Sequence, residues 1–337
     1  MIDIELIKKD VLEGKQIDKD AAMELYAQPL EILCRCADEI RRFFLSNKFD
    51  LCAIINGKSG RCSENCRFCA QSACNHTGAE EYPLLSEEKI VSQARKSEGQ
   101  GVPRFSIVTS GKRLSEWEVD KMCGAVRRIK TETALSVCVS FGLLNQAQYK
   151  RLKEAGVTRV HNNLEASRRY FPNICTTHTF DDKIEAIRAA QRAGLEVCSG
   201  GIMGMGEKAE DRVDMALTLR ELNIKSVPVN MLNPIPGTPL ENCERLSEAD
   251  MRRIAAVYRF ILPDAFIRLA GGRGLLPDKG RGCFRSGANA AITGDMLTTS
   301  GITPQTDGMM LQDLGYEVNC AGRQQNSAII KKRRGIR

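Results

Sequence analysis

The sequence predicts a (β/α)8 barrel preceded by a helical extension. Short apolar or β-branched runs alternate with amphipathic stretches of helical period from residue 49 to residue 315. Eight strand-and-helix pairs can be placed in this span, which fits one closed barrel better than two domains. No linker rich in Pro, Gly or Ser divides the chain. A doubly wound open sheet is the alternative.

We expect three regions along the chain. Residues 1–48 should form an N-terminal helical extension, because residues 18–27 and 30–45 place apolar side chains three and four positions apart. Residues 49–315 should form the barrel. Residues 316–337 should form a basic C-terminal tail, which we expect to be flexible.

The elements of the barrel follow from the same alternation. Strands are expected at residues 51–55, 104–109, 134–140, 157–164, 195–203, 226–232, 265–270 and 288–293. Helices are expected at residues 86–99, 115–131, 145–155, 180–193, 208–222, 247–262, 276–283 and 304–314. Ser86 and Ser247 precede acidic residues, as helix N-caps often do, and Gly156 and Gly194 stand where helices would end.

The composition excludes several classes of protein. The 337 residues are 42% hydrophobic and 27% charged, which is ordinary for a globular protein. No apolar run approaches the roughly 18–20 residues that a membrane helix needs, and the charged N-terminus lacks an apolar signal core. We therefore expect a cytoplasmic protein that keeps its fourteen cysteines reduced.

The net charge of +7 does not indicate a nucleic-acid-binding surface. Most of it lies in the C-terminal residues Lys331, Lys332, Arg333, Arg334 and Arg337. The remainder of the chain is close to neutral, and no stretch interleaves basic with aromatic residues.

The most informative motif is a CxxxCxxC run formed by Cys62, Cys66 and Cys69. Three thiolates on one loop can hold three corners of a cubane iron–sulfur cluster and leave the fourth iron open to a small molecule. A structural zinc site would need a fourth ligand, and His76 is the one nearby histidine. The spacing therefore favours an iron–sulfur cluster with an open coordination position over zinc or ordinary cysteines.

This loop, with Phe68 before its third cysteine, resembles the signature of radical S-adenosylmethionine (SAM) enzymes. Further strings, in order along the chain, resemble the biotin synthase family of that superfamily. They are CAQS at 69–72, HNNLE at 161–165, NICTT at 173–177, VCSGGIMG at 197–204, NML at 230–232, GTPL at 237–240, IRLAGGR at 267–273 and LTT at 297–299. With the cysteine loop they cover roughly residues 45–315.

The resemblance implies a reaction and its cofactors. Members of the family are sulfurtransferases that insert sulfur between two unactivated carbons of dethiobiotin, by way of a 5′-deoxyadenosyl radical. A [4Fe–4S] cluster held by Cys62, Cys66 and Cys69, together with SAM, provides that radical. The expected partners are dethiobiotin, an electron donor such as flavodoxin or ferredoxin, and a second copy of the chain in a homodimer. The alternatives are a hydrogenase maturase or mutase of the same superfamily, or a non-catalytic iron–sulfur or zinc protein.

The resemblance also implies roles for individual residues. The expected SAM-binding residues are Thr109, Ser110, Asn163, Glu165, Gly201 and Met203. The expected substrate-binding residues are Asn163, Asn230, Thr298 and Thr299. Because Asn163 and Glu165 are two positions apart on an expected strand, their side chains should point the same way. The glycines at 200–206 would let the backbone approach adenine closely.

One position departs from the family pattern. The family's well-known form holds an auxiliary [2Fe–2S] cluster, the source of the sulfur, with three cysteines and an arginine. Cys138, Cys198 and Arg268 match three of these positions, and Cys198 and Arg268 count with the three-cysteine loop among the expected catalytic residues. Ser106 stands at the fourth position, and its hydroxyl is a poorer iron ligand than a thiolate.

Three interpretations of this departure remain open. Ser106 binds the cluster weakly, another thiol joins a different type of auxiliary cluster, or no auxiliary cluster forms. We favour the second, with Cys175 as the first candidate and Cys74 as the next. The third is disfavoured because a buried arginine without an anionic partner is costly.

Overall fold

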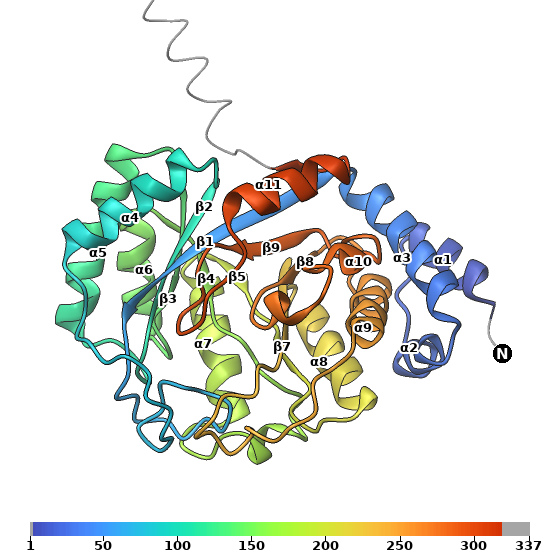
Figure 1. Cartoon of the computed structure of the whole chain (residues 1–337), viewed down its shortest axis with the longest axis horizontal. Helices are drawn as coiled ribbons and strands as arrows, with labels where there is room; N and C mark the ends of the chain where they lie inside the picture. Colours follow the sequence, from blue (N-terminus) through green and yellow to red (C-terminus); the bar gives the residue numbers. More distant parts are fainter. Residues whose placement is uncertain (1–2, 319–337) are drawn as a thin grey trace, which may run out of the picture.

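Eight parallel strands form a closed barrel, as the sequence predicts (Figure 1). This computed structural model describes residues 3–318. The barrel strands are β1 (Lys48–Lys58), β2 (Arg104–Thr109), β3 (Ser136–Ser140), β4 (Val157–His161), β5 (Glu196–Cys198) continued by β6 (Gly201–Met203), β7 (Ser226–Met231), β8 (Phe266–Leu269) and β9 (Ala290–Thr293). Pairing of β9 with β1, in the register Cys52 to Ile292, closes the barrel. The open-sheet alternative is therefore wrong.

The fifth barrel strand is broken where the sequence predicted one run over 195–203. Its two halves, β5 and β6, both pair with β7, and Ser199 and Gly200 interrupt them. A side chain at Gly200 would place its Cβ 1.9 Å from the carbonyl oxygen of Pro228 on β7. The break therefore depends on a residue without a side chain.

Helices surround the barrel and begin and end where the capping residues predict. They are α4 (Glu87–Gly99), α5 (Glu116–Glu132), α6 (Gln146–Ala155), α7 (Phe180–Arg192), α8 (Ala209–Glu221), α9 (Glu248–Ile261), α10 (Arg281–Phe284) and α11 (Pro304–Asp313). Ser86 and Ser247 accept hydrogen bonds from backbone N–H groups of the first turns of α4 and α9. Gly156 ends α6 in the left-handed conformation. The helix expected over 276–283 is only the short α10, preceded by a 3-10 turn at Arg273–Leu275.

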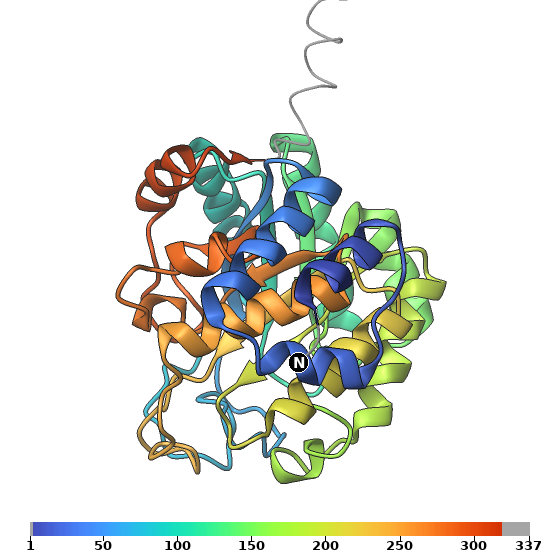
Figure 2. The same ribbon diagram turned by 90° about the vertical axis from the view of Figure 1, so that its right-hand side faces the viewer.

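The N-terminal helices pack on the outside of the barrel (Figure 2). They are α1 (Ile4–Leu12), α2 (Lys19–Tyr26) and α3 (Leu30–Leu45). The helix α3 lies against α9, and α2 contacts both α8 and α9. Arg253 on α9 donates 2.7 Å hydrogen bonds to the carbonyl oxygens of Tyr26 and Gln28, so it caps the end of α2.

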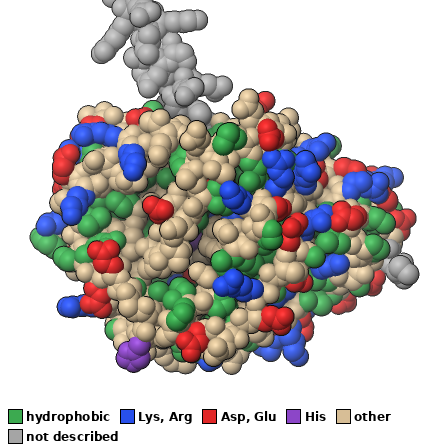
Figure 3. All heavy atoms as spheres, viewed as in Figure 1, with side chains coloured by type: hydrophobic (Ala, Val, Ile, Leu, Met, Phe, Trp, Pro, Cys, Tyr) green, Lys and Arg blue, Asp and Glu red, His purple; other side chains and the backbone are tan. Residues whose placement is uncertain are grey.

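The last described residues return to the first strand. The short strand β10 (Glu317–Val318) pairs with the start of β1, and Tyr316 donates a 2.6 Å hydrogen bond to the carbonyl oxygen of Phe284. The rest of the expected basic tail lies outside the described residues. Within residues 3–318, no helix combines the length and the apolar character needed to cross a membrane. Lys and Arg side chains alternate with Asp and Glu over the face shown in Figure 3.

We expect Gly200→Ala to destabilise the fold by about 2–3 kcal/mol, because the new methyl group would overlap the Pro228 carbonyl. Urea unfolding monitored by circular dichroism measures this loss. Gly274→Ala is the matched control, since nothing lies within 4 Å of its added Cβ. Equal stabilities of the two variants would contradict the close approach at Gly200.

Candidate metal-cluster site and barrel cavity

The three-cysteine loop leaves the end of β1 and is held by its own backbone. The N–H of Cys62 donates to the carbonyl oxygen of Gln71 at 3.0 Å, and the N–H of Cys69 donates to that of Cys66 at 3.1 Å. The Asn75 amide donates to the carbonyl oxygens of both Cys66 and Cys69, at 3.2 and 2.9 Å. The three thiols are partly buried, and burial raises the pKa of Cys69 to about 11. These hydrogen bonds fix the shape of the loop. A metal ion bound there would replace the protons of the thiols.

A cavity of about 300 Å³ opens beside this loop inside the barrel. Cys69 and Phe68 line it from the loop. Its other lining residues include many that the sequence singled out, namely Ser106, Cys138, Asn163, Glu165, Cys198, Asn230, Arg268, Thr298 and Thr299. These come from β2, β3, β7, β8, the end of β5 and the segments after β4 and β9. The cavity therefore collects residues as far apart in the chain as Phe68 and Thr299.

Four expected SAM-binding residues do not line this cavity: Thr109, Ser110, Gly201 and Met203. The Ser110 hydroxyl is buried and donates a 2.8 Å hydrogen bond to the carbonyl oxygen of Gly60, which ties β2 to the start of the cysteine loop. Met203 is fully buried in the core. Their expected role in binding SAM stays a prediction.

Asn163 and Glu165 follow β4 rather than lying on it. The strand ends at His161, and Glu165 adopts a left-handed conformation with φ of 69°, which is uncommon for a residue with a side chain. Both side chains nevertheless enter the cavity, and the Asn163 amide donates to Glu165 Oε2 at 3.2 Å. Burial raises the pKa of Glu165. The expectation of two neighbours on one strand face was wrong, although the side chains meet.

Asn230 on β7 is fixed by the backbone on two sides. Its amide nitrogen donates to the carbonyl oxygen of Gly201 at 3.0 Å, and its amide oxygen accepts from the N–H of Gly271 at 2.8 Å. One N–H and one lone pair of the amide remain for a ligand in the cavity. The side chain is therefore oriented before any ligand arrives.

The inner part of the barrel holds a buried charge cluster centred on Asp50. Arg159 and Arg268 each place a guanidinium nitrogen 2.7 Å from Asp50 Oδ2, and Arg104 Nε lies 3.5 Å from Oδ1. Burial alone would raise the pKa of Asp50, but Arg268, Arg104 and Arg159 together hold it below its usual range. Glu196, which is largely exposed, also pairs with Arg159 at 3.0 Å, so the five side chains together carry a net charge of +1.

Cys198 and Cys138 lie beside this charge cluster. Burial alone would raise the pKa of Cys198, but a hydrogen bond from His161 and the nearby Arg268 and Arg159 lower it to about 6. Cys138 is fully buried, and burial raises its pKa. One of the two thiols is thus already poised to be a thiolate and a metal ligand.

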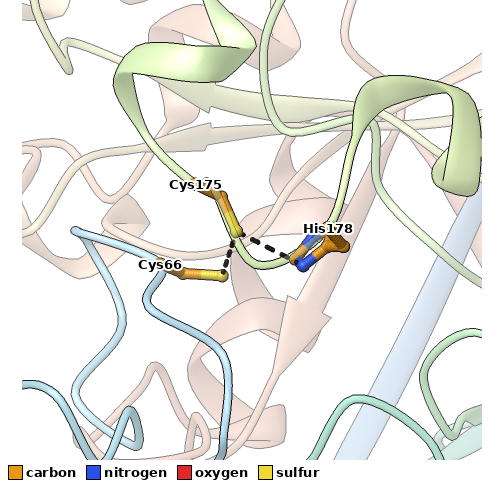
Figure 4. A group of neighbouring side chains, drawn as sticks. All are labelled: Cys66, Cys175 and His178. Carbon is orange, nitrogen blue, oxygen red and sulfur yellow. Dashed lines mark hydrogen bonds between the residues drawn. The ribbon is translucent and has the colours of Figure 1, made fainter.

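A second group of side chains lies behind Cys66 (Figure 4). The sulfur of Cys175 is 3.7 Å from that of Cys66 and 3.3 Å from His178 Nδ1. His178 Nδ1 in turn lies 2.6 Å from Glu64 Oε2. Cys175 and the exposed Cys74 do not line the barrel cavity. The structure therefore places both candidate extra thiols outside the group formed by Cys138, Cys198 and Arg268.

Comparison with known proteins identifies the family. A model of the Radical SAM superfamily matches residues 58–219, and a model of the Biotin and Thiamin Synthesis associated domain matches residues 228–317. A biotin synthase of Brachyspira hyodysenteriae is 58% identical over 94% of this chain and 95% of its own length. The chain belongs to the biotin synthase family. Biotin synthases of Akkermansia muciniphila and Clostridium botulinum strain Alaska E43 are 54% and 53% identical, over 91% and 94% of this chain and 96% and 99% of theirs.

Solved structures support the fold. Methylornithine synthase (PylB) superposes with a TM-score of 0.81 at 20% identity, covering 93% of this chain and 97% of its own. The [FeFe]-hydrogenase maturase HydG also gives 0.81, at 18% identity, covering 94% of this chain and 75% of its own. At these identities the likeness extends to the fold alone.

The residues present fit the cofactors that the family uses. The three thiols of the loop suit a [4Fe–4S] cluster with one open iron. Inside the barrel, the net positive charge and the buried Arg104 Nε, which has no hydrogen-bond partner among the described residues, suit an anionic group such as a thiolate-ligated auxiliary cluster.

Sequence reasoning missed five residues around the inner cavity. They are Asp50, Cys52, Arg104, Arg159 and His161. Their signal was the alternation of inward positions along β1, β2 and β4, at residues 50, 52 and 54, at 104, 106 and 108, and at 159 and 161. In an apolar or mixed strand the sequence does not show which of the two alternating sets of side chains points into the barrel.

We expect Asp50→Asn to cost the apoprotein about 3–5 kcal/mol, because it leaves Arg104 and Arg268 without a counter-charge and Arg159 with only the largely exposed Glu196. Denaturant unfolding measures the change. The matched control is Asp264→Asn, which removes an ion pair with Lys225 whose two side chains are about half exposed and should cost less than about 1 kcal/mol. Similar losses in both variants would contradict a central role for Asp50.

Proposed function

We propose that the protein is a biotin synthase, a radical SAM sulfurtransferase that converts dethiobiotin to biotin. The observation that carries the proposal is the joint placement of three elements around one cavity. A cysteine loop with an open-iron spacing borders it, the pre-oriented Asn230 amide faces it, and Cys138 and Cys198 lie deeper inside. The identities of 53–58% over almost the whole chain support the same function.

When bound, the [4Fe–4S] cluster with SAM supplies hydrogen-atom abstraction from unactivated carbon, and the auxiliary cluster supplies sulfur. Cys62, Cys66 and Cys69 would hold the first cluster, and the backbone hydrogen bonds of their loop keep the three sulfurs in place. Glu165 would accept hydrogen bonds from ribose hydroxyls, and the Asn163 amide would donate to them.

The substrate would lie between the two clusters. The free N–H and lone pair of Asn230 match the acceptor and donor of a ureido group. Thr298 and Thr299, on the segment after β9, offer hydroxyls for the substrate's carboxylate. Asn230, Thr298 and Thr299 all line the same cavity, so a single extended substrate can reach the amide and the hydroxyls.

The remaining wall excludes water from a reactive carbon centre. Apolar side chains line it, among them Ile54, Val108, Ile202, Ile292 and Met296. A dry wall protects a radical from side reactions.

Four further features are expected by analogy with the biotin synthase family. The electron donor is a flavodoxin or ferredoxin, the enzyme is a homodimer, and it works in the cytoplasm, where its thiols stay reduced. Residues 1–48, 49–315 and 316–337 are its helical extension, catalytic barrel and basic tail.

Anaerobic incubation with SAM, a strong reductant and dethiobiotin should yield 5′-deoxyadenosine and biotin, measured by mass spectrometry. Cys62→Ala, Cys66→Ala and Cys69→Ala should each abolish both products, because each removes a cluster ligand. Cys243→Ala is the control, since this cysteine lies on a loop outside the cavity. Formation of 5′-deoxyadenosine without biotin would favour another radical SAM enzyme, and absence of both would favour an electron carrier.

Asn230→Asp should raise the KM for dethiobiotin about tenfold and leave the KM for SAM within about twofold. The change keeps the acceptor for the Gly271 N–H but removes the amide nitrogen, so the hydrogen bond to the Gly201 carbonyl oxygen and the one offered to the substrate are both lost. Steady-state kinetics with each substrate varied in turn separates the two effects. Equal rises in both constants would indicate a general distortion of the cavity instead.

A further inference from the structure

We propose that Cys52 is a ligand of the auxiliary iron–sulfur cluster, supplying the thiolate that the Ser106 position lacks. This inference rests on the proposed function and concerns how this chain completes that cluster. It replaces Cys175 and Cys74 with a thiol that neither the family pattern nor the cysteine spacing singles out.

Cys52 lies on the inner face of the barrel, next to the Ser106 position. Cys52 lies on β1 and is fully buried within the barrel, where it lines the cavity together with Ser106, Cys138 and Cys198. Ser106 on β2 pairs with Ile54 of β1 and with Cys138 of β3. Cys52 is two residues before Ile54, so both side chains point inward. It therefore stands one strand away from Ser106, on the same inner face.

The sulfurs of Cys52, Cys138 and Cys198 are not gathered around one point. Among the described residues, Cys66, Cys175 and His178 form the one group of three potential ligands whose atoms all lie within 4.8 Å of one another. The sulfurs of Cys52, Cys138 and Cys198 are thus spread more widely. Thiolates on one zinc ion lie about 3.8 Å apart, given Zn–S bonds of about 2.3 Å. At least one pair of these sulfurs is therefore more than 4.8 Å apart, which is wider than one tetrahedral ion requires and suits terminal ligands on different irons of one cluster.

The inner end of the cavity carries a surplus of positive charge. Arg104, Arg159 and Arg268 face two carboxylates, the buried Asp50 and the largely exposed Glu196, so one positive charge is left over. Arg104 Nε has no hydrogen-bond partner within residues 3–318. A buried surplus of positive charge needs an anion. Three thiolates on an iron–sulfur cluster provide that charge at the place where Arg104 and Arg268 face the cavity.

Cys52 offers iron a better ligand than Ser106 does. Iron binds thiolate more readily than a serine hydroxyl. With Cys52, the inner cavity offers three thiols in addition to Arg268, the same number that the family pattern would have with cysteine in place of Ser106. The third thiol would thus lie on β1, the strand next to Ser106, and would bind the cluster from that side.

The test counts iron in a background that lacks the first cluster. The Cys62→Ala, Cys66→Ala, Cys69→Ala triple variant is reconstituted anaerobically with iron and sulfide, and iron, sulfide and Mössbauer spectra are recorded. We expect the triple variant to retain a cluster. Adding Cys52→Ala or Cys52→Ser should reduce its iron at least fivefold, as should Cys138→Ala. Adding Cys175→Ala, Ser106→Ala or the buried-helix control Cys36→Ala should leave iron and spectrum unchanged.

Unchanged iron and an unchanged spectrum after loss of Cys52 would overturn the proposal, as would a triple variant that binds no iron. Circular dichroism and melting curves confirm that each variant is folded, and the near-isosteric Cys52→Ser guards against a packing defect. In the otherwise intact chain, Cys52→Ala should still form 5′-deoxyadenosine while biotin falls at least tenfold. If the wild type makes no biotin, the proposed function fails, and the iron counts still decide whether Cys52 is a ligand.

Discussion

The interior of this barrel depends on one buried carboxylate. Asp50 on β1 contacts Arg104 on β2, Arg159 on β4 and Arg268 on β8, so a single side chain ties four of the eight strands together from inside. Most (β/α)8 barrels fill this space with layers of branched apolar residues. Here the polar group replaces such packing and leaves room above it for a cavity. The fold therefore tolerates a hollow interior because charge, and not packing alone, connects its strands.

The same arrangement makes the cavity chemically uneven. At its inner end the guanidinium groups favour anions and lower the pKa of Cys198, whereas its wall is apolar and its outer end carries the thiols of the loop. Asn230 lies between these regions and is fixed by Gly201 and Gly271. A ligand with a polar ring would thus be held beside thiols on both sides. This division into a charged inner end, an apolar wall and an outer end with thiols distinguishes the site from an ordinary barrel pocket.

The fold could be predicted because the hydrophobic periodicity and the capping residues of its helices are local signals. The cysteine loop could be predicted because its three cysteines are close together in the sequence. Other features depend on contacts between distant segments. The break between β5 and β6 follows from the approach of Pro228 to Gly200, which nothing in residues 195–203 announces. Cys52 sits in an apolar run and looks like a buried hydrophobe until β9 closes the barrel. Cys175 is over 100 positions from Cys66, so spacing could not pair them.

The segment after β4 links the two ends of the site. Its beginning carries Asn163 and Glu165 into the cavity, and its end places Cys175 and His178 behind Cys66. The contact from His178 to Glu64 ties this segment to the cysteine loop, because Glu64 belongs to that loop. The segment after β4 and the cysteine loop therefore support each other. Residues that would hold the nucleoside and residues that would hold the first cluster thus share one support, which keeps their separation constant.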